Sequence, residues 1–171
     1  MNHIKIIENL RVNSEVFKHL FQTVSDEQAR WKPGEDKWSI LEVINHLYDE
    51  EREDFRKRLE LVLNNPEDPW PPIDPEGWVV QRNYNDRNLK QSLQNFFDER
   101  EKSLLWLDRL DRPDWQATYR HPQMGPMSAE LILVNWIAHD LFHIRQATDL
   151  HFAYLTKTVK PVSLNYSGWE K

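Results

Sequence analysis

The hydrophobic and polar positions of this chain follow the period of an amphipathic helix over four long stretches. In the first, residues 3–24, apolar side chains recur every three or four positions, at Ile6, Leu10, Phe17, Leu20 and Val24. The second begins at Ser39, which together with Glu42 has the sequence pattern of a capping box, and it continues to Leu63. We therefore expect a long helix over each range, with a short helical turn capped by Ser25 between them.

The other two helical stretches lie in the second half of the chain. One covers residues 88–111, and the other follows Ser128, an expected N-cap, as far as about Tyr154. The connections at residues 64–87 and 112–127 are rich in proline, which the interior of a helix excludes. Four amphipathic helices predict an all-α fold, a four-helix bundle, and the long first connection suits a crossover between helices two and three.

A chain of 171 residues is long enough for one domain with a substantial core. We expect a single domain over residues 1–171, with a polar C-terminal tail at about residues 156–171. The eight tryptophans are more than such a core needs. Several lie in the connections and could line a pocket, and the segment from Trp70 to Trp78 is expected to form its lid. The alternative is that the tryptophans only cover the ends of the bundle.

Charge and composition exclude several classes of function. The net charge is −6, and the 22 basic and 28 acidic residues are interspersed, so a nucleic-acid or acidic-membrane surface is disfavoured. The mean hydropathy is −0.78 and no long apolar segment or signal-peptide core is present, which predicts a cytoplasmic protein. The absence of cysteine removes disulfides, thiolate zinc sites and cysteine nucleophiles, and four glycines are too few for a phosphate-binding loop.

Candidate chemistry is concentrated in the fourth helical stretch. His139 and His143 are four residues apart in its most apolar part, so they share one helix face and can bind one metal ion together. They are either core histidines with hydrogen-bond partners or metal ligands. His46, at the edge of the apolar stripe of the second helix, is the best-placed third ligand. Three histidines and an open position for water are the arrangement of a catalytic metal site rather than a structural one.

Two motifs frame these histidines. The first runs Trp38-Ser39-Ile40-x-Glu42-Val43-Ile44-x-His46-Leu47-x-Asp49-Glu50, and the second runs Gly125-x-Met127-Ser128 and then His139-Asp140-x-x-His143-x-x-Gln146. Together with Arg100 between them, they resemble the DinB superfamily, including its YfiT-like members, over nearly the whole chain. The resemblance implies a four-helix bundle with a long crossover between helices two and three. It also implies that His46, His139 and His143 hold a divalent ion, most often zinc or nickel.

The resemblance further implies two kinds of activity. Family members with an assigned activity are thiol-dependent enzymes that use a low-molecular-weight thiol such as bacillithiol or mycothiol, and others are hydrolases. Because this chain has no cysteine, a thiol would have to come from a small-molecule cosubstrate. A metal-dependent transferase or hydrolase is therefore one hypothesis. The other is a non-catalytic, metal-binding or stress-related bundle, which could form a homodimer through an apolar helix face.

Three further polar residues have open roles, and no catalytic residue is assigned. Glu50, one turn after His46, is either a general base or supporting carboxylate, or part of a solvated helix face. Arg100 either pairs with a carboxylate of a facing helix or holds an anionic substrate group. Asp140 points about 100° away from His139 on the helical wheel, so we expect it to support a neighbouring helix by a hydrogen bond.

Overall fold

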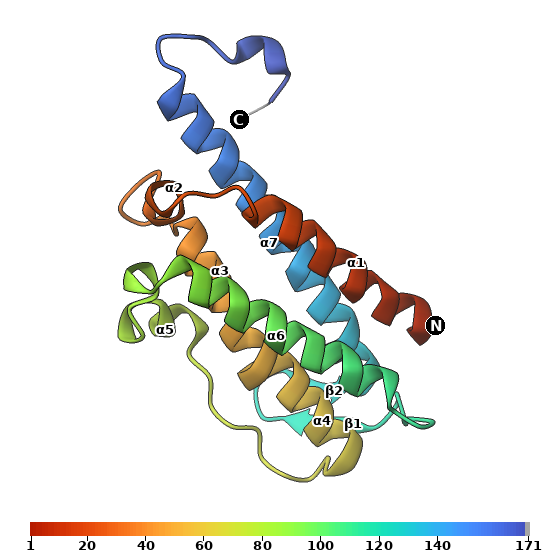
Figure 1. The fold of residues 1–171 in the computed structure, drawn as a ribbon. Coiled ribbons are helices and arrows are strands. Elements are labelled where there is room, and N and C mark those ends of the chain that lie inside the picture. Colours follow the sequence, from red (N-terminus) through yellow and green to blue (C-terminus); the bar gives the residue numbers. More distant parts are fainter. Residues whose placement is uncertain (170–171) are drawn as a thin grey trace.

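The computed structural model describes residues 1–169, and its helices confirm the expected fold class (Figure 1). Its long helical segments are α1 (His3–Phe21), the run of α3 (Ile40–Asp49), η1 (Glu50–Phe55) and α4 (Arg56–Asn64), then α6 (Leu89–Asp108) and α7 (Ala129–Thr158). Shorter helices are α2 (Asp26–Arg30), α5 (Pro75–Gln81), η2 (Tyr84–Asp86) and η3 (Asn165–Ser167).

The bundle has two pairs of parallel helices. α1 packs against α7 and α3 packs against α6. Figure 1 shows that α3–α4 and α6 run in one direction, whereas α1 and α7 run in the other. The segment between α4 and α6 must therefore return along the length of the bundle, and this is the expected crossover.

Side-chain caps begin the helices where the sequence predicts them. The Ser39 hydroxyl accepts from the backbone N–H of Glu42, and the Glu42 carboxylate accepts from the backbone N–H of Ser39 in return. Ser25 caps α2 and Ser128 caps α7 in the same manner with their hydroxyls. These caps satisfy N–H groups that have no partner within the helix, so they fix where each helix starts.

The expected second helix is continuous but not uniform. Between α3 and α4, residues Glu50–Phe55 form a π-helix, whose wider turn has hydrogen bonds between residues five apart. A polar segment in a plain α-helix would be expected to leave its carboxylates in water. Here Glu50, Glu51 and Asp54 are all buried. The π-helix therefore changes which side chains face the interior, next to the histidine of the first motif.

Both connections contain secondary structure that the proline pattern did not predict. α5 begins at Pro75, a first-turn position where proline is tolerated, and Asp74 caps it by accepting from the backbone N–H of Gly77. The second connection holds a hairpin of β1 (Thr118–His121) and β2 (Gly125–Ser128), paired antiparallel. Gly125 has a φ of 76°, which glycine adopts without steric cost.

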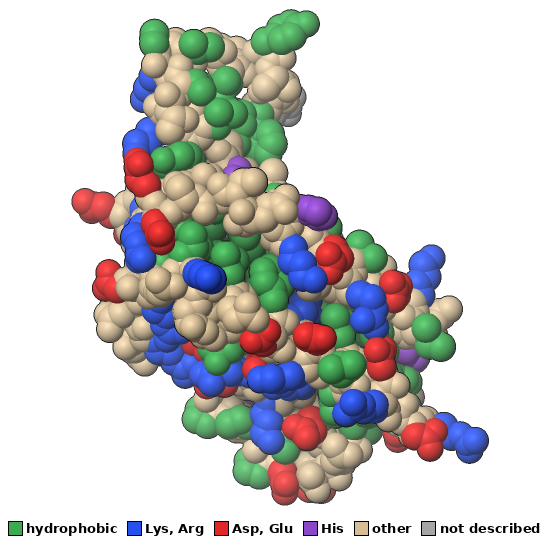
Figure 2. Space-filling model, in the orientation of Figure 1, with side chains coloured by type: hydrophobic (Ala, Val, Ile, Leu, Met, Phe, Trp, Pro, Cys, Tyr) green, Lys and Arg blue, Asp and Glu red, His purple; other side chains and the backbone are tan. Residues whose placement is uncertain are grey.

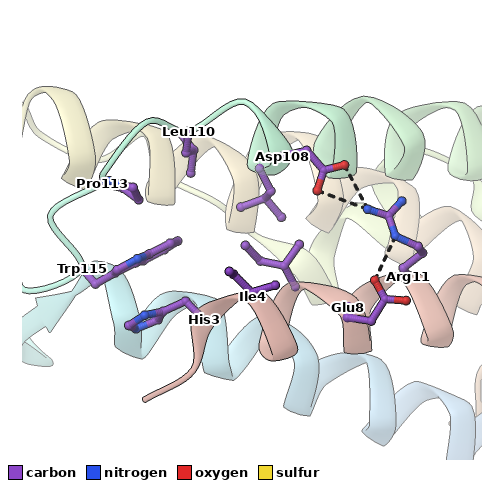
Figure 3. Close-up of a pocket in the computed structure, with 10 residues that line it drawn as sticks. His3, Ile4, Glu8, Arg11, Asp108, Leu110, Pro113 and Trp115 are labelled. Carbon is purple, nitrogen blue, oxygen red and sulfur yellow. Dashed lines mark hydrogen bonds and ion pairs between the residues drawn. The ribbon is translucent and has the colours of Figure 1, made fainter.

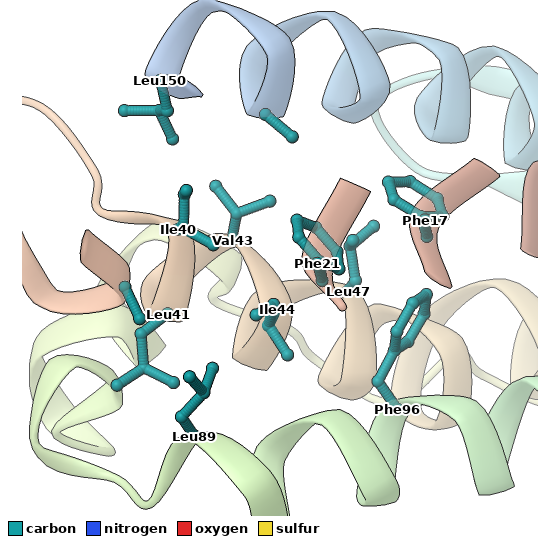
Figure 4. Packing of buried hydrophobic residues seen from close by; sticks show 12 residues of the cluster. Phe17, Phe21, Ile40, Leu41, Val43, Ile44, Leu47, Leu89, Phe96 and Leu150 are labelled. Carbon is teal, nitrogen blue, oxygen red and sulfur yellow. The ribbon is translucent and has the colours of Figure 1, made fainter. Parts of the chain in front are cut away.

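A polar layer divides the hydrophobic core into two clusters. Figure 4 shows the first cluster, in which Phe17, Ile44 and Phe96 are fully buried where α1, α3 and α6 meet. The second cluster, around Trp136 and Leu133, lies toward the hairpin end of α7. On each of the four long segments, buried polar residues lie between the two clusters in sequence, among them Asn13, Glu51, Arg100 and Asp140.

Acidic and basic side chains are interspersed over the face that Figure 2 shows. Hydrophobic side chains gather over the end of α7 and the segment after it, where Leu155, Val162 and Tyr166 are exposed. Among residues 1–169, no helix combines the length and apolar character that crossing a membrane requires.

Candidate metal centre

The three candidate ligands meet in the middle of the bundle. α3 supplies His46 and α7 supplies His139 and His143. The Nε2 atom of His139 lies 3.2 Å from Nε2 of His46 and 3.1 Å from Nε2 of His143. The fold thus brings together, from positions 93 residues apart, the side chains that the sequence singled out.

The histidine pKa values show that the imidazoles are neutral. Burial is the main cause of the lowered pKa of each ring, which falls to about 3 for His46, about 2 for His139 and about 4 for His143. For His46 and His139, the neighbouring imidazoles lower the pKa further. A neutral imidazole is the form that binds a metal ion.

The nitrogen geometry fits a divalent ion. A neutral Nε2 atom either donates one proton or accepts at one lone pair, so His139 Nε2 cannot make good hydrogen bonds to both of its neighbours. A tetrahedral ion with nitrogens at about 2.0–2.1 Å holds them about 3.3 Å apart, close to the observed separations. The donor set therefore suits a shared cation better than a hydrogen-bonded cluster.

Neighbouring side chains orient the imidazoles. The Nδ1–H of His143 is placed to donate to Oε1 of Gln146 at 2.7 Å, which leaves its Nε2 lone pair for a metal. The indole of Trp38 lies parallel to the ring of His143, with centroids 6.4 Å apart, and its centroid is 4.9 Å from that of His46. Phe55 packs on His139 with ring centroids 5.0 Å apart. The rings are thus held from several sides.

All three histidines line a cavity of about 670 Å³. Its other lining residues come from the segment before α3, from η1, α5 and α7: Asp36, Lys37, Trp38, Glu50, Pro75, Glu76, Phe142 and Gln146. The crossover therefore contributes to the cavity, as expected, but through Pro75 and Glu76. Trp70 instead stacks on Tyr119 at 4.5 Å, and Trp78 is buried beneath the Arg82 guanidinium. Within the expected lid, residues 70–78, the cavity is therefore lined by Pro75 and Glu76 and not by the tryptophans.

Glu50 is a buried carboxyl beside the histidines. Only 4% of it is exposed, so the alternative of a solvated helix face is wrong. Burial and the neighbouring Asp54 raise the pKa of Glu50 to about 9. Its Oε1 atom is buried without a hydrogen-bond partner in the part of the chain that the structure describes. A polar atom of this kind beside a cavity calls for a role beyond packing.

Arg100 and Asp140 form an ion cluster behind the metal site. The Arg100 guanidinium donates to both oxygens of Asp140 at 2.7 Å and lies 2.9 Å from Oε2 of Glu51. Trp136 also donates its indole N–H to Glu51, and Asn13 donates its amide to Asp140. Of the two alternatives for Arg100, the structure shows the pairing with carboxylates of facing helices. Asp140 supports neighbouring helices through Arg100 and Asn13, as expected from the sequence.

Sequence reasoning missed Glu51 in this cluster. In a regular helix it would lie 100° from Glu50, among other acidic residues, with nothing to mark it as buried. The π-helix turns Glu51 toward Arg100 while Glu50 faces the histidines. The unusual density of acidic residues just after a buried helix was the one available signal.

A second cavity, of about 390 Å³, lies between α1 and the end of α6 (Figure 3). Ile4 and Trp115 contribute to its walls, and Arg11 spans it by pairing with both Glu8 and Asp108. The imidazole of His3 stacks on Trp115 and pairs with Glu130, which satisfies it. The candidate metal ligands lie outside this cavity.

Comparison with known proteins identifies the family. The model of the DinB superfamily matches residues 9–147. The chain belongs to the DinB superfamily. The matched range includes His46, His139 and His143, together with the buried Arg100 cluster, and it confirms the resemblance found in the sequence.

One solved DinB-like structure has the same architecture. It is YfiT from Bacillus subtilis, described as a probable metal-dependent hydrolase with an unusual four-helix bundle topology. The two chains are 20% identical, and they match with a TM-score of 0.74 over 85% of this chain and 83% of that one. At this identity the likeness establishes the fold. A comparison with curated proteins gave no match.

Proposed function

We propose that this DinB-like protein is a divalent-metal-dependent enzyme with His46, His139 and His143 as its metal ligands. The observation that carries the proposal is the convergence of three neutral Nε2 atoms on the wall of a cavity. A divalent ion bound there would lower the pKa of a water or thiol at its remaining position and so supply a nucleophile near neutral pH. The reaction would be hydrolysis or transfer to a thiol.

The residues around the histidines have distinct parts in this function. Burial keeps the imidazoles neutral, and Gln146 keeps the Nε2 lone pair of His143 directed at the site. Trp38 and Phe142 give the cavity apolar walls that would bind the carbon skeleton of a substrate and exclude water. A volume of about 670 Å³ suits a small molecule.

Hydrolysis and thiol transfer differ in the source of the nucleophile. The description of YfiT as a probable metal-dependent hydrolase supports hydrolysis. Thiol transfer would require a low-molecular-weight thiol cosubstrate, because the chain has no cysteine. Imidazole ligands suit zinc, nickel and other late transition metals, and we propose zinc or nickel as the metal.

Elemental analysis tests the metal site. Untagged protein, purified without chelators or a nickel column, is compared with His143→Ala and with His19→Ala, which removes an exposed histidine of α1. We expect about one equivalent of a divalent metal in the wild type and in His19→Ala, and loss of the metal in His143→Ala. A wild type that stays metal-free after dialysis against zinc and against nickel would refute the proposal.

Activity assays then separate an enzyme from a non-catalytic metal-binding bundle. The metal-loaded protein is assayed with activated esters and amides, and with small thiols plus an electrophile. Turnover above that of the free metal, lost in His143→Ala, supports the enzyme. A tightly bound metal without any such turnover favours the non-catalytic bundle.

A further inference from the structure

The α7 helix has a second face with apolar side chains, on the side that no other helix covers. One arc of its helical wheel carries five exposed side chains: Ala138, Leu141, Phe142, Arg145 and Asp149. Leu141 and Phe142 are 55% and 56% exposed. The other side of α7 already packs against α1, α3 and α4. A helix with apolar side chains nearly all round is typically covered on all sides.

The side chains along this face have a two-fold pattern centred on the position of Ala147. Arg145 and Asp149 lie at equal distances before and after it in the sequence, and their charges are opposite. Ala138 and Thr156 also lie at equal distances from it, and both are small and exposed. Two α7 helices that cross antiparallel at Ala147 would place Arg145 opposite the partner subunit's Asp149, and this contact would occur twice. The face is therefore complementary to itself in charge.

We propose that this face of α7 binds a second copy of the chain, as an antiparallel helix pair about a two-fold axis near Ala147. A pair of this kind is closed, so assembly ends at the dimer. Besides the charge contacts, it brings Leu141 against the partner subunit's Phe152 on each side of the axis. The groove between α1 and α6 is also partly apolar, but its Arg11 is already paired within the chain.

The same face of α7 borders the cavity of the candidate metal centre. Phe142 and Gln146 line that cavity, and Phe142 is also part of the exposed face. Figure 1 shows that the last turns of α7 extend beyond the end of α1. In the antiparallel pair, this extension would lie along the partner subunit's Phe142. Each subunit would therefore cover the edge of the other's cavity.

Analytical ultracentrifugation of the full-length protein over a range of concentrations tests the pairing. The wild type is compared with Arg145→Glu, with the double variant Arg145→Glu and Asp149→Arg, and with Lys90→Glu. Lys90 is an exposed cation of α6, so Lys90→Glu changes the net charge by as much as Arg145→Glu does. Circular dichroism checks that each variant is folded.

We expect the wild type to be a dimer. Arg145→Glu should raise the dissociation constant by about 100-fold or more, because acidic side chains would then face each other at two equivalent contacts. The double variant should restore the dimer, since the opposite charges have only exchanged places. Lys90→Glu should associate as the wild type does.

Disulfide cross-linking tests the register of the pair. The chain has no cysteine, so a disulfide can form only between introduced ones. Ala138→Cys combined with Thr156→Cys should give a covalent dimer under oxidising conditions, because these positions lie opposite each other. Neither single variant should do so, because the two copies of each position would be about 27 Å apart along the helices, at about 1.5 Å per residue.

Four results would overturn the inference. Two concern association: a wild type that stays monomeric, or a double charge variant that associates no better than Arg145→Glu. A third is equal weakening of the dimer by Arg145→Glu and Lys90→Glu, which would be an effect of net charge. The fourth is cross-linking that is the same in the double cysteine variant and in the single ones. None of these measurements depends on the metal, so their outcome is independent of the proposed function.

Discussion

Replacing Arg100 with leucine should destabilise the protein strongly, and more strongly at neutral than at acidic pH. Arg100 is only 1% exposed, and it is the cation that faces the buried carboxylates of Glu51 and Asp140. Leucine would fill part of the space but leave two buried acidic groups without their counter-charge. Breaking a buried ion pair in this way costs about 3–5 kcal/mol.

The pH dependence follows from the carboxyl pKa values. Burial already raises the pKa of Glu51 in the native protein, and Arg100 is the largest influence that lowers it. Without Arg100 the folded-state pKa rises further above the unfolded value of about 4.3. A carboxyl group with a raised folded-state pKa adds stability below the unfolded pKa and loses it as pH rises. The loss should therefore grow by up to ~1.4 kcal/mol per pH unit above about pH 4 through Glu51.

Urea denaturation followed by circular dichroism, at several pH values between about 4 and 7, measures this effect. The free energy of unfolding of Arg100→Leu should approach that of the wild type at the acidic end. A triple variant, Arg100→Leu with Glu51→Leu and Asp140→Leu, should recover much of the loss, because apolar groups can replace a buried ion cluster. A loss of stability that is the same at every pH, or a triple variant no better than the single one, would refute the electrostatic reasoning.

Three other predictions concern the metal site and the helix that carries His46. The metal-free protein should lose stability as pH falls from about 6.5 to about 4. The three histidines have lowered pKa values in the folded state, so the unfolded chain takes up protons first. Acid titration followed by circular dichroism measures this loss. Gln146→Leu should weaken metal binding by about 10-fold or more in chelator competition, because it removes the hydrogen-bond partner of His143 Nδ1. An unchanged metal affinity would mean that Gln146 does not orient the His143 ring. Ser39→Ala should lower the free energy of unfolding by about 1–2 kcal/mol in urea denaturation, since the hydroxyl caps α3 and donates to Asn85; a loss near zero would show that neither contact matters.

The helices were predictable because their determinants are local. Apolar periodicity and the serine caps depend on residues within one or two turns, and they placed the start of α3 and of α7 correctly. The hairpin at residues 118–128 and the short α5 were not predicted, because proline was taken to exclude regular structure. Proline is compatible with the first turn of a helix and, at Pro126, with a strand of a two-stranded sheet.

The site was predictable in part for the same reason. The spacing of His139 and His143 places them on one face of any helix, and the family motif pointed to His46. The burial of Glu50 and Glu51 was not predictable, since their sequence context is acidic and suggests water. It depends on a π-helix that α6 and α7 enclose, and on an arginine 49 positions further along the chain that neutralises Glu51.

The sequence by itself determined the four long helical segments, the family and the three histidines that are candidates for one metal, because periodicity, capping and motif spacing are properties of neighbouring residues. Only the tertiary structure decided that the three Nε2 atoms converge beside a cavity, that Arg100 lies between two carboxylates, and that Glu50 faces the histidines. Those outcomes depend on contacts between segments far apart in the chain. There the protonation state of a side chain depends on its burial and its charged neighbours as well as on its residue type.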